Sequence, residues 1–358
     1  MESDDTKQLS SPFLLVEESL VSSSPEIPLD PAWVMLSDPT LEEFRVKLNP
    51  PSYLRIYECQ ENIDISLEEL GKAAQETINE HLADHGAILF RNLQNHIPNA
   101  TAFARFWNGC CDNSTDWKPT TYMSFGHSRK TLEGVDLATN IPPDRPLSCH
   151  SELMYNPRPP SRIAFYCLQE AIDGGETILS RNYTDYIPED IKALVREKGG
   201  CLYIREHPDE NNLSRSHHDK RNTAISTWQD KAGTKDREEA VEFFCRHGFD
   251  RKHIQFDENG TMRLEFFHPG FTMHQGKELF YNLIGIIPVT KQPKDGTPYP
   301  TEIEDRVRIE RMKSVTAFKM RRGDWLMLDN MTVLHGRLPY RENPKGMAPR
   351  TLLTVYTE

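Results

Sequence analysis

The chain has 358 residues and a formal net charge of −12 at pH 7, with 42 Lys and Arg against 54 Asp and Glu. This acidic balance, without any basic block, argues against nucleic acid as a partner. No stretch of about 18 apolar residues occurs, which argues against a helix that crosses a membrane.

Cysteine usage and the N-terminal residues favour a cytoplasmic protein. The seven cysteines have no regular spacing and include no Cys-x-x-Cys pair, so neither a disulfide framework nor a structural zinc site is expected. The first residues lack the basic and apolar regions of a secretory signal. We therefore expect a cytoplasmic protein that acts on a small molecule, without a membrane or nucleic-acid partner.

The composition changes once, near the N-terminus. Residues 1–28 are rich in Ser, Glu, Asp and Pro and are predicted to form a largely disordered tail. No linker follows, so residues 29–358 are predicted to form a single domain. The sequence leaves the oligomeric state open.

The hydrophobic pattern after the tail predicts helices that flank a set of short strands. Residues 66–85 have apolar positions at helical spacing, with Ser66 and Glu69 as a capping-box pair and Gly86 as the C-terminal stop. Further helices are expected at 101–107, 188–198, 236–247 and 302–314, and strands at 87–90, 163–168, 176–180, 262–267, 279–283, 325–328, 332–334 and 351–356, with 112–148 rich in loops. This order is typical of a β-rich sandwich or barrel supported by helices.

A candidate metal site begins at His150-Ser-Glu152. On an extended segment both side chains would lie on one face, because strand side chains alternate with a period of two. His335, just past the strand predicted at 332–334, could add a second imidazole. Two imidazoles and one carboxylate are the ligands that non-haem Fe(II) oxygenases use. The pair alone is a weak signal, since 13 His and 54 acidic residues make chance pairs common, and a solvated strand-edge pair is the alternative.

An oxygenase of this kind needs an oxidisable co-substrate that reduces O2. If the co-substrate is a 2-oxo diacid, its distal carboxylate needs a bidentate cation. The planar guanidinium of Arg350, at the start of the last predicted strand, suits that role. The hydroxyl of Thr177 could add a hydrogen bond, so both residues are predicted to bind the co-substrate.

Three further residues are candidates for binding the substrate. Tyr155 lies three residues after Glu152, and simple packing is its alternative role. Asn282 could reach the substrate or the co-substrate, unless it is a structural amide. Arg181 could pair with a substrate carboxylate, unless it forms a surface salt bridge.

A resemblance to the taurine dioxygenase and clavaminate synthase family is carried by six motifs, namely His150-Ser-Glu152, Pro159-Pro160-Ser161-Arg162, Gly174-Gly175-Glu176-Thr177, Leu328-Asp329-Asn330-Met331, His335-Gly336-Arg337 and Pro349-Arg350. The resemblance extends from about residue 86 to residue 356. Within the family, Thr227-Trp228-Gln229, Thr234 to Arg237 and Phe280-Tyr281-Asn282 are similar to the branch that contains the syringomycin-pathway aspartyl hydroxylase.

The resemblance implies a mainly β fold with flanking helices around a double-stranded β-helix, the jelly-roll or cupin-like core. It implies Fe(II) bound by His150, Glu152 and His335, and 2-oxoglutarate bound by Arg350 and Thr177. It further implies an oxygenase that hydroxylates, desaturates or cyclises at an unactivated C–H bond of a small amino-acid-like or natural-product-like substrate. O2 is consumed, succinate and CO2 are released, and ascorbate would support activity. The carboxylate at Glu152 argues against halogenation, because halogenating relatives lack it.

One departure from the family pattern leaves alternatives open. The segment between His335 and Arg350 is longer than is usual in the resembling branch, so Arg337 and Arg341 are rivals for the co-substrate. Arg350 is preferred because it follows Pro349 and opens the last predicted strand. Two other functions also remain open: a hydrolase that uses the same three ligands on a metal ion, and a catalytically inactive jelly-roll that only binds a ligand.

Overall fold

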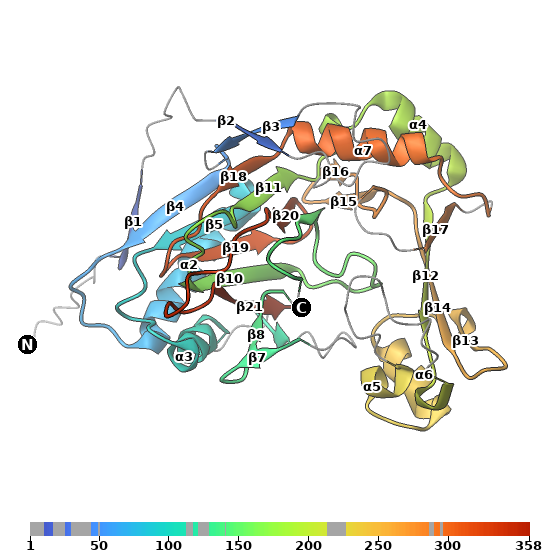
Figure 1. The fold of residues 1–358 in the computed structure, drawn as a ribbon, viewed down its shortest axis with the longest axis horizontal. Helices are drawn as coiled ribbons and strands as arrows, with labels where there is room; N and C mark the ends of the chain where they lie inside the picture. The colour runs from blue at the N-terminus through green and yellow to red at the C-terminus, as the bar shows by residue number, and fades with distance from the viewer. Residues whose placement is uncertain are drawn as a thin grey trace, which may run out of the picture.

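Two large β-sheets form the centre of the computed structural model (Figure 1). The structure describes residues 11–16, 26–29, 44–48, 51–111, 117–120, 129–139, 141–212, 227–285, 290–293 and 296–358. We call the nine-stranded sheet the major sheet and the six-stranded sheet the minor sheet. The helices are α2 (Leu67–His85), α3 (Ala100–Cys111), α4 (Glu189–Lys198), α5 (Trp228–Ala232), α6 (Arg237–Arg246) and α7 (Thr301–Lys313), with short 3-10 turns η2 (Thr184–Tyr186), η3 (Glu210–Asn212) and η5 (Arg251–His253).

The major sheet has the spatial order β1-β4-β5-β19-β10-β21-β8-β7, and β6 also pairs with β21. Its strands are β1 (Phe13–Leu15), β4 (Leu54–Cys59), β5 (Ala87–Arg91), β6 (Pro119–Thr120), β7 (Thr131–Leu132), β8 (Val135–Leu137), β10 (Arg162–Gln169), β19 (Trp325–Asp329) and β21 (Thr351–Thr357). Neighbouring strands are antiparallel except β4 and β5, which are parallel and are connected through α2.

The helix α2 begins and ends where its capping residues predict. The hydroxyl of Ser66 accepts a hydrogen bond from the Glu69 N–H at 3.2 Å, and the Glu69 carboxylate accepts one from the Ser66 N–H at 3.0 Å. These two bonds satisfy donors that the first helical turn leaves without partners. Gly86 ends the helix at φ 75°, a left-handed conformation that glycine adopts without steric cost. The helix predicted at 66–85 is therefore confirmed.

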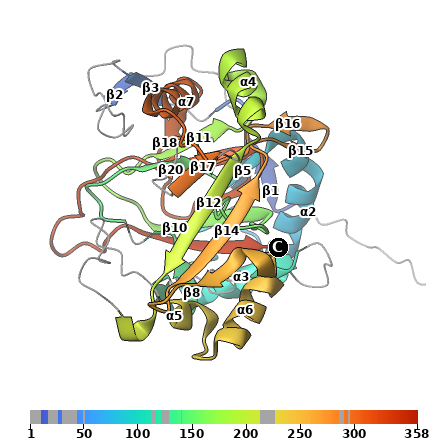
Figure 2. The same ribbon diagram turned by 90° about the vertical axis from the view of Figure 1, so that its right-hand side faces the viewer.

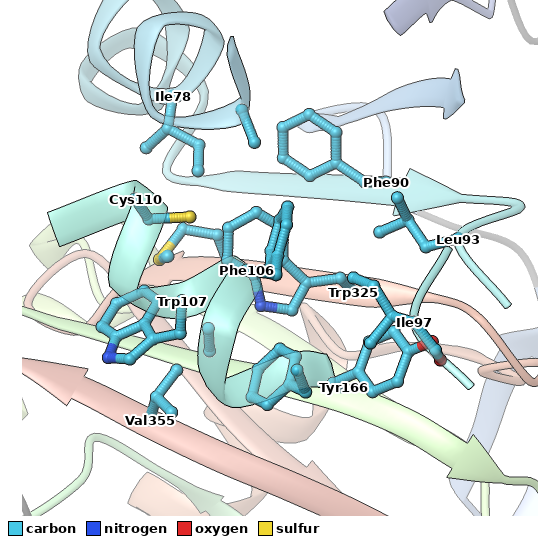
Figure 3. Close-up of a cluster of buried hydrophobic side chains, with 14 of the residues drawn as sticks. Ile78, Phe90, Leu93, Ile97, Phe106, Trp107, Cys110, Tyr166, Trp325 and Val355 are labelled. Atoms are coloured by element: carbon cyan, nitrogen blue, oxygen red, sulfur yellow. The ribbon is translucent and has the colours of Figure 1, made fainter. Parts of the chain in front are cut away.

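A hydrophobic core fastens α2 and α3 to one face of the major sheet (Figure 3). Trp325 stacks on Phe90 with 5.2 Å between ring centroids and meets Phe106 edge-on at 4.8 Å. The two helices cross closely, because a Cβ atom on Gly71 or Gly109 would overlap a backbone carbonyl of the other helix. Each large apolar side chain buried here contributes about 1.5–3 kcal/mol, so this layer supports the sheet from behind.

The minor sheet has the order β2-β3-β18-β11-β20-β9. Its strands are β2 (Glu26–Leu29), β3 (Phe44–Leu48), β9 (Leu147–His150), β11 (Thr177–Arg181), β18 (Thr316–Phe318) and β20 (Val333–Arg337). A second core cluster joins Leu179 and Val333 of the minor sheet to Phe165, Leu328 and Tyr356 of the major sheet. The two sheets therefore face each other across this cluster.

A smaller four-stranded sheet follows α4 in the chain (Figure 2). It has the order β13-β14-β12-β17, with β12 (Cys201–His207), β13 (Ile254–Phe256), β14 (Met262–His268) and β17 (Thr290–Pro293), and a separate hairpin pairs β15 (Thr272–His274) with β16 (Lys277–Leu279). Figure 2 shows α5 and α6 at one end of β12 and β14, and α4 and α7 at the other. Within the part of the chain that the structure describes, no helix has the length and apolar character needed to cross a membrane.

Several predicted elements differ from the structure. The strand predicted at 279–283 is wrong beyond Leu279, because the buried guanidinium of Arg311 binds the carbonyls of Phe280, Asn282 and Ile284 and holds that segment in an irregular turn. The loop-rich stretch contains the short strands β6, β7 and β8. The strands β4 and β12 were not expected from the sequence.

Part of the predicted N-terminal tail is ordered. Phe13–Leu15 forms β1 and pairs with β4, and the Phe13 ring lies 4.7 Å from that of Phe90 in the core. The strand β2 pairs with β3. For these residues the structure shows docked strands, while the rest of the tail lies outside the described residues and the division at residue 28 stays a prediction.

Candidate active site

The antiparallel pair of β9 and β20 brings two distant histidines together. In its register His150, the last residue of β9, lies directly opposite His335 in β20. The two imidazole rings are 4.6 Å apart between centroids. The prediction that His335 lies just past a strand is wrong, because this strand pairing places it inside β20.

Glu152 reaches the same point from a turn. The strand β9 ends at His150, and Leu153 has a φ of 54°, so the His-x-Glu segment is not extended as expected. The side-chain amide of Asn330 accepts the Glu152 N–H at 2.7 Å and donates to the carbonyls of Glu152 at 2.9 Å and Pro160 at 2.8 Å. Tertiary contacts, and not strand alternation, therefore place this carboxylate beside the histidines.

The three side chains converge in a geometry that suits one metal ion. The Nε2 atoms of His150 and His335 each lie 3.9 Å from Oε2 of Glu152. One ligand atom from each residue lies within 4.8 Å of the others, and all three residues are buried. Both His–Glu distances lie within the separation of about 4.2 Å that is possible for two ligands that each bind an ion at about 2.1 Å. The donor set, two imidazoles and a carboxylate, suits Fe(II) with open coordination positions.

The protonation of the histidines also suits a metal. Nδ1 of His150 lies 2.8 Å from the carbonyl oxygen of Ser148, which favours a proton on Nδ1 and a free lone pair on Nε2. Burial, and then the positive electrostatic influence of His150 and Arg129, lowers the pKa of His335 well below its usual range. A neutral imidazole is the form that binds a metal ion.

Arg129 is a neighbour of the site that sequence reasoning missed. Its Nη2 atom lies 3.1 Å from Oε2 of Glu152, and both side chains are largely buried. It also donates to the carbonyls of Leu137 and Ala138 in and after β8. No local pattern distinguishes this arginine within the stretch predicted as loops, so only the fold could reveal it.

The predicted co-substrate residues lie along the inner face of β11 and beside its start. Thr177 is buried and is two residues from Leu179, which pairs with His335. Arg350 donates weakly to the Gly175 carbonyl at 3.4 Å, and a Cβ on Gly175 would meet the Arg350 Nε atom at 3.2 Å. Because strand residues rise about 3.3 Å each, Thr177 and Leu179 of β11 are separated by about 6.6 Å. This spacing lets a small diacid extend from the three ligands toward Arg350.

The two rival arginines have different surroundings. Arg341 is 87% exposed and pairs with Asp173 at 3.3 Å, so it lies on the surface. Arg337 is buried beside Thr177, its cross-strand partner. The guanidinium carbons of Arg337 and Arg350 lie 4.8 and 5.1 Å from the centre of the Tyr340 ring. The structure therefore gives no support to Arg341 and places two cations near one another.

Comparison with known proteins decides the family of the chain. The model of the TauD, TfdA family of taurine catabolism dioxygenases matches residues 52–356, which is most of the chain. The chain belongs to this family. It is an Fe(II)- and 2-oxoglutarate-dependent dioxygenase with a double-stranded β-helix core, as the resemblance implied. Family membership thus favours this reaction over the hydrolase and the inactive binding protein.

Two relatives are about a quarter identical to this chain over most of its length. The dapdiamide synthesis protein DdaC of Enterobacter agglomerans is 24% identical over 301 residues, covering 77% of this chain and 84% of that protein. A clavaminate synthase-like protein of Arabidopsis thaliana is 25% identical over 281 residues, with 72% and 79% covered. Among solved structures, the Fe, alpha-ketoglutarate dependent oxygenase PvcB matches at 17% identity and a TM-score of 0.49, over 86% of this chain and 87% of that one.

The three candidate substrate residues of this dioxygenase have structural contacts. The Arg181 guanidinium donates to the His85 carbonyl at 2.6 Å at the end of α2 and lies over the Tyr53 ring. The Asn282 amide binds the Gly270 carbonyl and the Ile284 N–H. Tyr155 is buried under the Arg205 guanidinium, 3.9 Å from the ring centre. These contacts support packing and helix termination for the three residues, and their predicted substrate roles stay untested.

Proposed function

We propose that His150, Glu152 and His335 hold the Fe(II) ion of this dioxygenase, and that Arg350 and Thr177 bind 2-oxoglutarate. The convergence of three buried ligand atoms within 4.8 Å carries the metal assignment. When bound, the iron supplies the activation of O2 that couples decarboxylation of 2-oxoglutarate to oxidation of a C–H bond. The half-buried, partly desolvated Arg350 beside Gly175 supports the co-substrate assignment.

The residues of the chain would orient the reactants and exclude water. The hydrogen bond from His150 to Ser148 fixes the imidazole so that Nε2 faces Glu152. The Phe165 ring, 5.1 Å from that of His335, covers the site from the major sheet. Arg350 would bind the distal carboxylate through two parallel N–H groups, and the Thr177 hydroxyl would add a hydrogen bond.

The substrate is proposed to be a small amino-acid-like or natural-product-like molecule, which is hydroxylated or otherwise oxidised at an unactivated C–H bond. The similarity to a protein named for dapdiamide synthesis supports a role in natural-product biosynthesis. The acidic net charge of −12 argues against a nucleic-acid partner, and we propose a cytoplasmic enzyme.

The metal assignment is tested by Fe(II) binding and by turnover of 2-oxoglutarate to succinate in the presence of ascorbate. We expect His150→Ala and Glu152→Ala to lower metal affinity at least 100-fold and to abolish succinate formation, because each change removes a ligand. His253→Ala, at a partly exposed histidine of η5, is the matched control and should retain both properties. Full metal binding in either ligand variant would refute the assignment.

The co-substrate assignment is tested separately by equilibrium binding of 2-oxoglutarate. Arg350→Gln should weaken binding strongly, whereas Arg341→Gln should leave it unchanged because Arg341 lies on the surface. The reverse result would show that Arg341, and not Arg350, binds 2-oxoglutarate.

A further inference from the structure

Arg337 lies between His335, which pairs with Leu179 of β11, and Arg350, which lies beside Gly175 just before β11. It follows His335 by two residues in β20, so both side chains lie on the same face of the strand. Across the sheet it pairs with Thr177 of β11. It is only 4% exposed. The residue thus lies beside the proposed co-substrate site, for which it was so far only an alternative to Arg350.

The hydrogen bonds of Arg337 are only half satisfied. Its Nη2 atom donates to the carbonyls of Pro142 at 3.0 Å and Arg145 at 2.6 Å, in the loop that leads into β9. Its buried Nε and Nη1 atoms have no hydrogen-bond partner among the described residues. Buried N–H groups of a charged side chain are rarely left without acceptors, because the loss of hydration is not compensated.

The positive charge of Arg337 is only partly compensated, by the more distant carboxylate of Asp144 and by the phenol of Tyr340. Arg350 shares the Tyr340 ring with Arg337, and within the described parts of the chain neither arginine has a carboxylate within 4 Å. Two neighbouring guanidinium groups without a directly paired carboxylate form a site that an anionic ligand would stabilise.

We propose that Arg337 is a second cation for the distal carboxylate of 2-oxoglutarate, which its Nε and Nη1 atoms bind together with Arg350, while its Nη2 atom holds the 142–145 loop. This inference rests on the proposed function, in which Arg350 binds that carboxylate. It predicts that the site discriminates strongly between 2-oxo acids with and without a distal carboxylate. It also ties the bound diacid to the loop that precedes His150.

The test compares the binding of two 2-oxo acids by calorimetry, without O2 and with Mn(II) in place of Fe(II). The probes are 2-oxoglutarate and 2-oxovalerate, which has the same chain length and no distal carboxylate. We expect Arg337→Gln to weaken 2-oxoglutarate binding about 10- to 100-fold and to change 2-oxovalerate binding less than about twofold. Arg337→Lys, which keeps a charge and the stem, should give a smaller loss with the same selectivity, and it replaces the Gln variant if that variant does not fold.

Two control variants separate the possible outcomes. Arg311→Gln removes another buried arginine, one that donates only to backbone carbonyls, and should lower stability without changing the ratio of the two affinities. An equal loss for both probes, or no loss, in the Arg337 variants would show that Arg337 only supports the loop, and would overturn the inference. If Arg350→Gln leaves 2-oxoglutarate binding intact, the proposed function fails at its co-substrate site instead.

Discussion

At the scale of single residues, Asn330 determines where the carboxylate of Glu152 lies. It is completely buried, and its three hydrogen bonds connect the turn between β19 and β20 to the backbone around Glu152. Asp329 supports the same turn by accepting the N–H groups of Met331 and Thr332. Asn330 is not one of the three proposed metal ligands, so we regard it as a positioning residue.

Replacement of Asn330 should affect both stability and metal binding. Asn330→Ala leaves two backbone groups of Glu152 and one of Pro160 without their partner, and we expect a loss of about 3 kcal/mol in the free energy of unfolding. The turn would also loosen, so Fe(II) affinity should fall about tenfold, measured by titration of the folded protein. Asn282→Ala, which removes a buried amide elsewhere, should lower stability with metal affinity retained. Equal metal affinity in the two variants would contradict the positioning role.

His268 should make the fold sensitive to acid. Burial lowers its pKa to about 4, and its Nδ1 atom accepts the Gly270 N–H at 3.0 Å, which requires the neutral ring. The unfolded chain binds the proton near pH 6.5, so the contribution is complete above that pH and is lost as the pH falls toward 4, by at most about 3 kcal/mol.

The measurement is the difference in unfolding free energy between the parent and His268→Asn from pH 7 to pH 4. Asn retains an acceptor for Gly270 and cannot be protonated, so the variant should lose less stability on acidification. The difference is needed because burial raises the pKa of Asp324 to about 6. Protonation of Asp324 therefore stabilises the folded state in the same interval as the pH falls. Parallel pH profiles for the two proteins would exclude His268 as the source.

At the scale of secondary structure, local signals predicted the elements that the chain specifies locally. The capping box of α2 and the apolar runs of β5, β10, β19 and β21 are contained within short segments, and they were placed correctly. The segment after Leu279 also has the composition of a strand. Its carbonyls are nevertheless bound by Arg311, about 30 residues later, and no local pattern reveals such a contact.

The same distinction applies to the candidate site. The residue types and their order were sufficient to single out His150, Glu152 and His335, which the fold does bring together. The turn that places Glu152, the contact from Arg129 and the half-satisfied guanidinium of Arg337 depend on the pairing of distant strands. The directions of the Arg181 and Asn282 side chains depend on tertiary packing in the same way, so their substrate roles could not be judged from spacing.

At the scale of the whole molecule, the site and the helical layer lie on opposite faces of the major sheet. The inner face carries Phe165 against His335, while the other face packs on α2 and α3 (Figure 3). The N-terminal strand β1 pairs with β4, the neighbour of β5, and contributes Phe13 to the helical side. We therefore expect that weakening the edge strand β1 lowers the stability of the fold without moving the proposed metal ligands.

Phe13 provides a test of that separation. Phe13 is 4% exposed and packs edge-on against Phe90, so Phe13→Ala should lower the free energy of unfolding by about 3 kcal/mol, measured by urea denaturation. Leu14→Ala, at a neighbouring side chain that is 57% exposed, should change it by less than about 0.5 kcal/mol. Both variants should bind Fe(II) and 2-oxoglutarate with the affinity of the parent while folded. Equal denaturation midpoints would show that β1 does not dock in solution, whereas weakened Fe(II) binding in folded Phe13→Ala would show that the two faces are coupled.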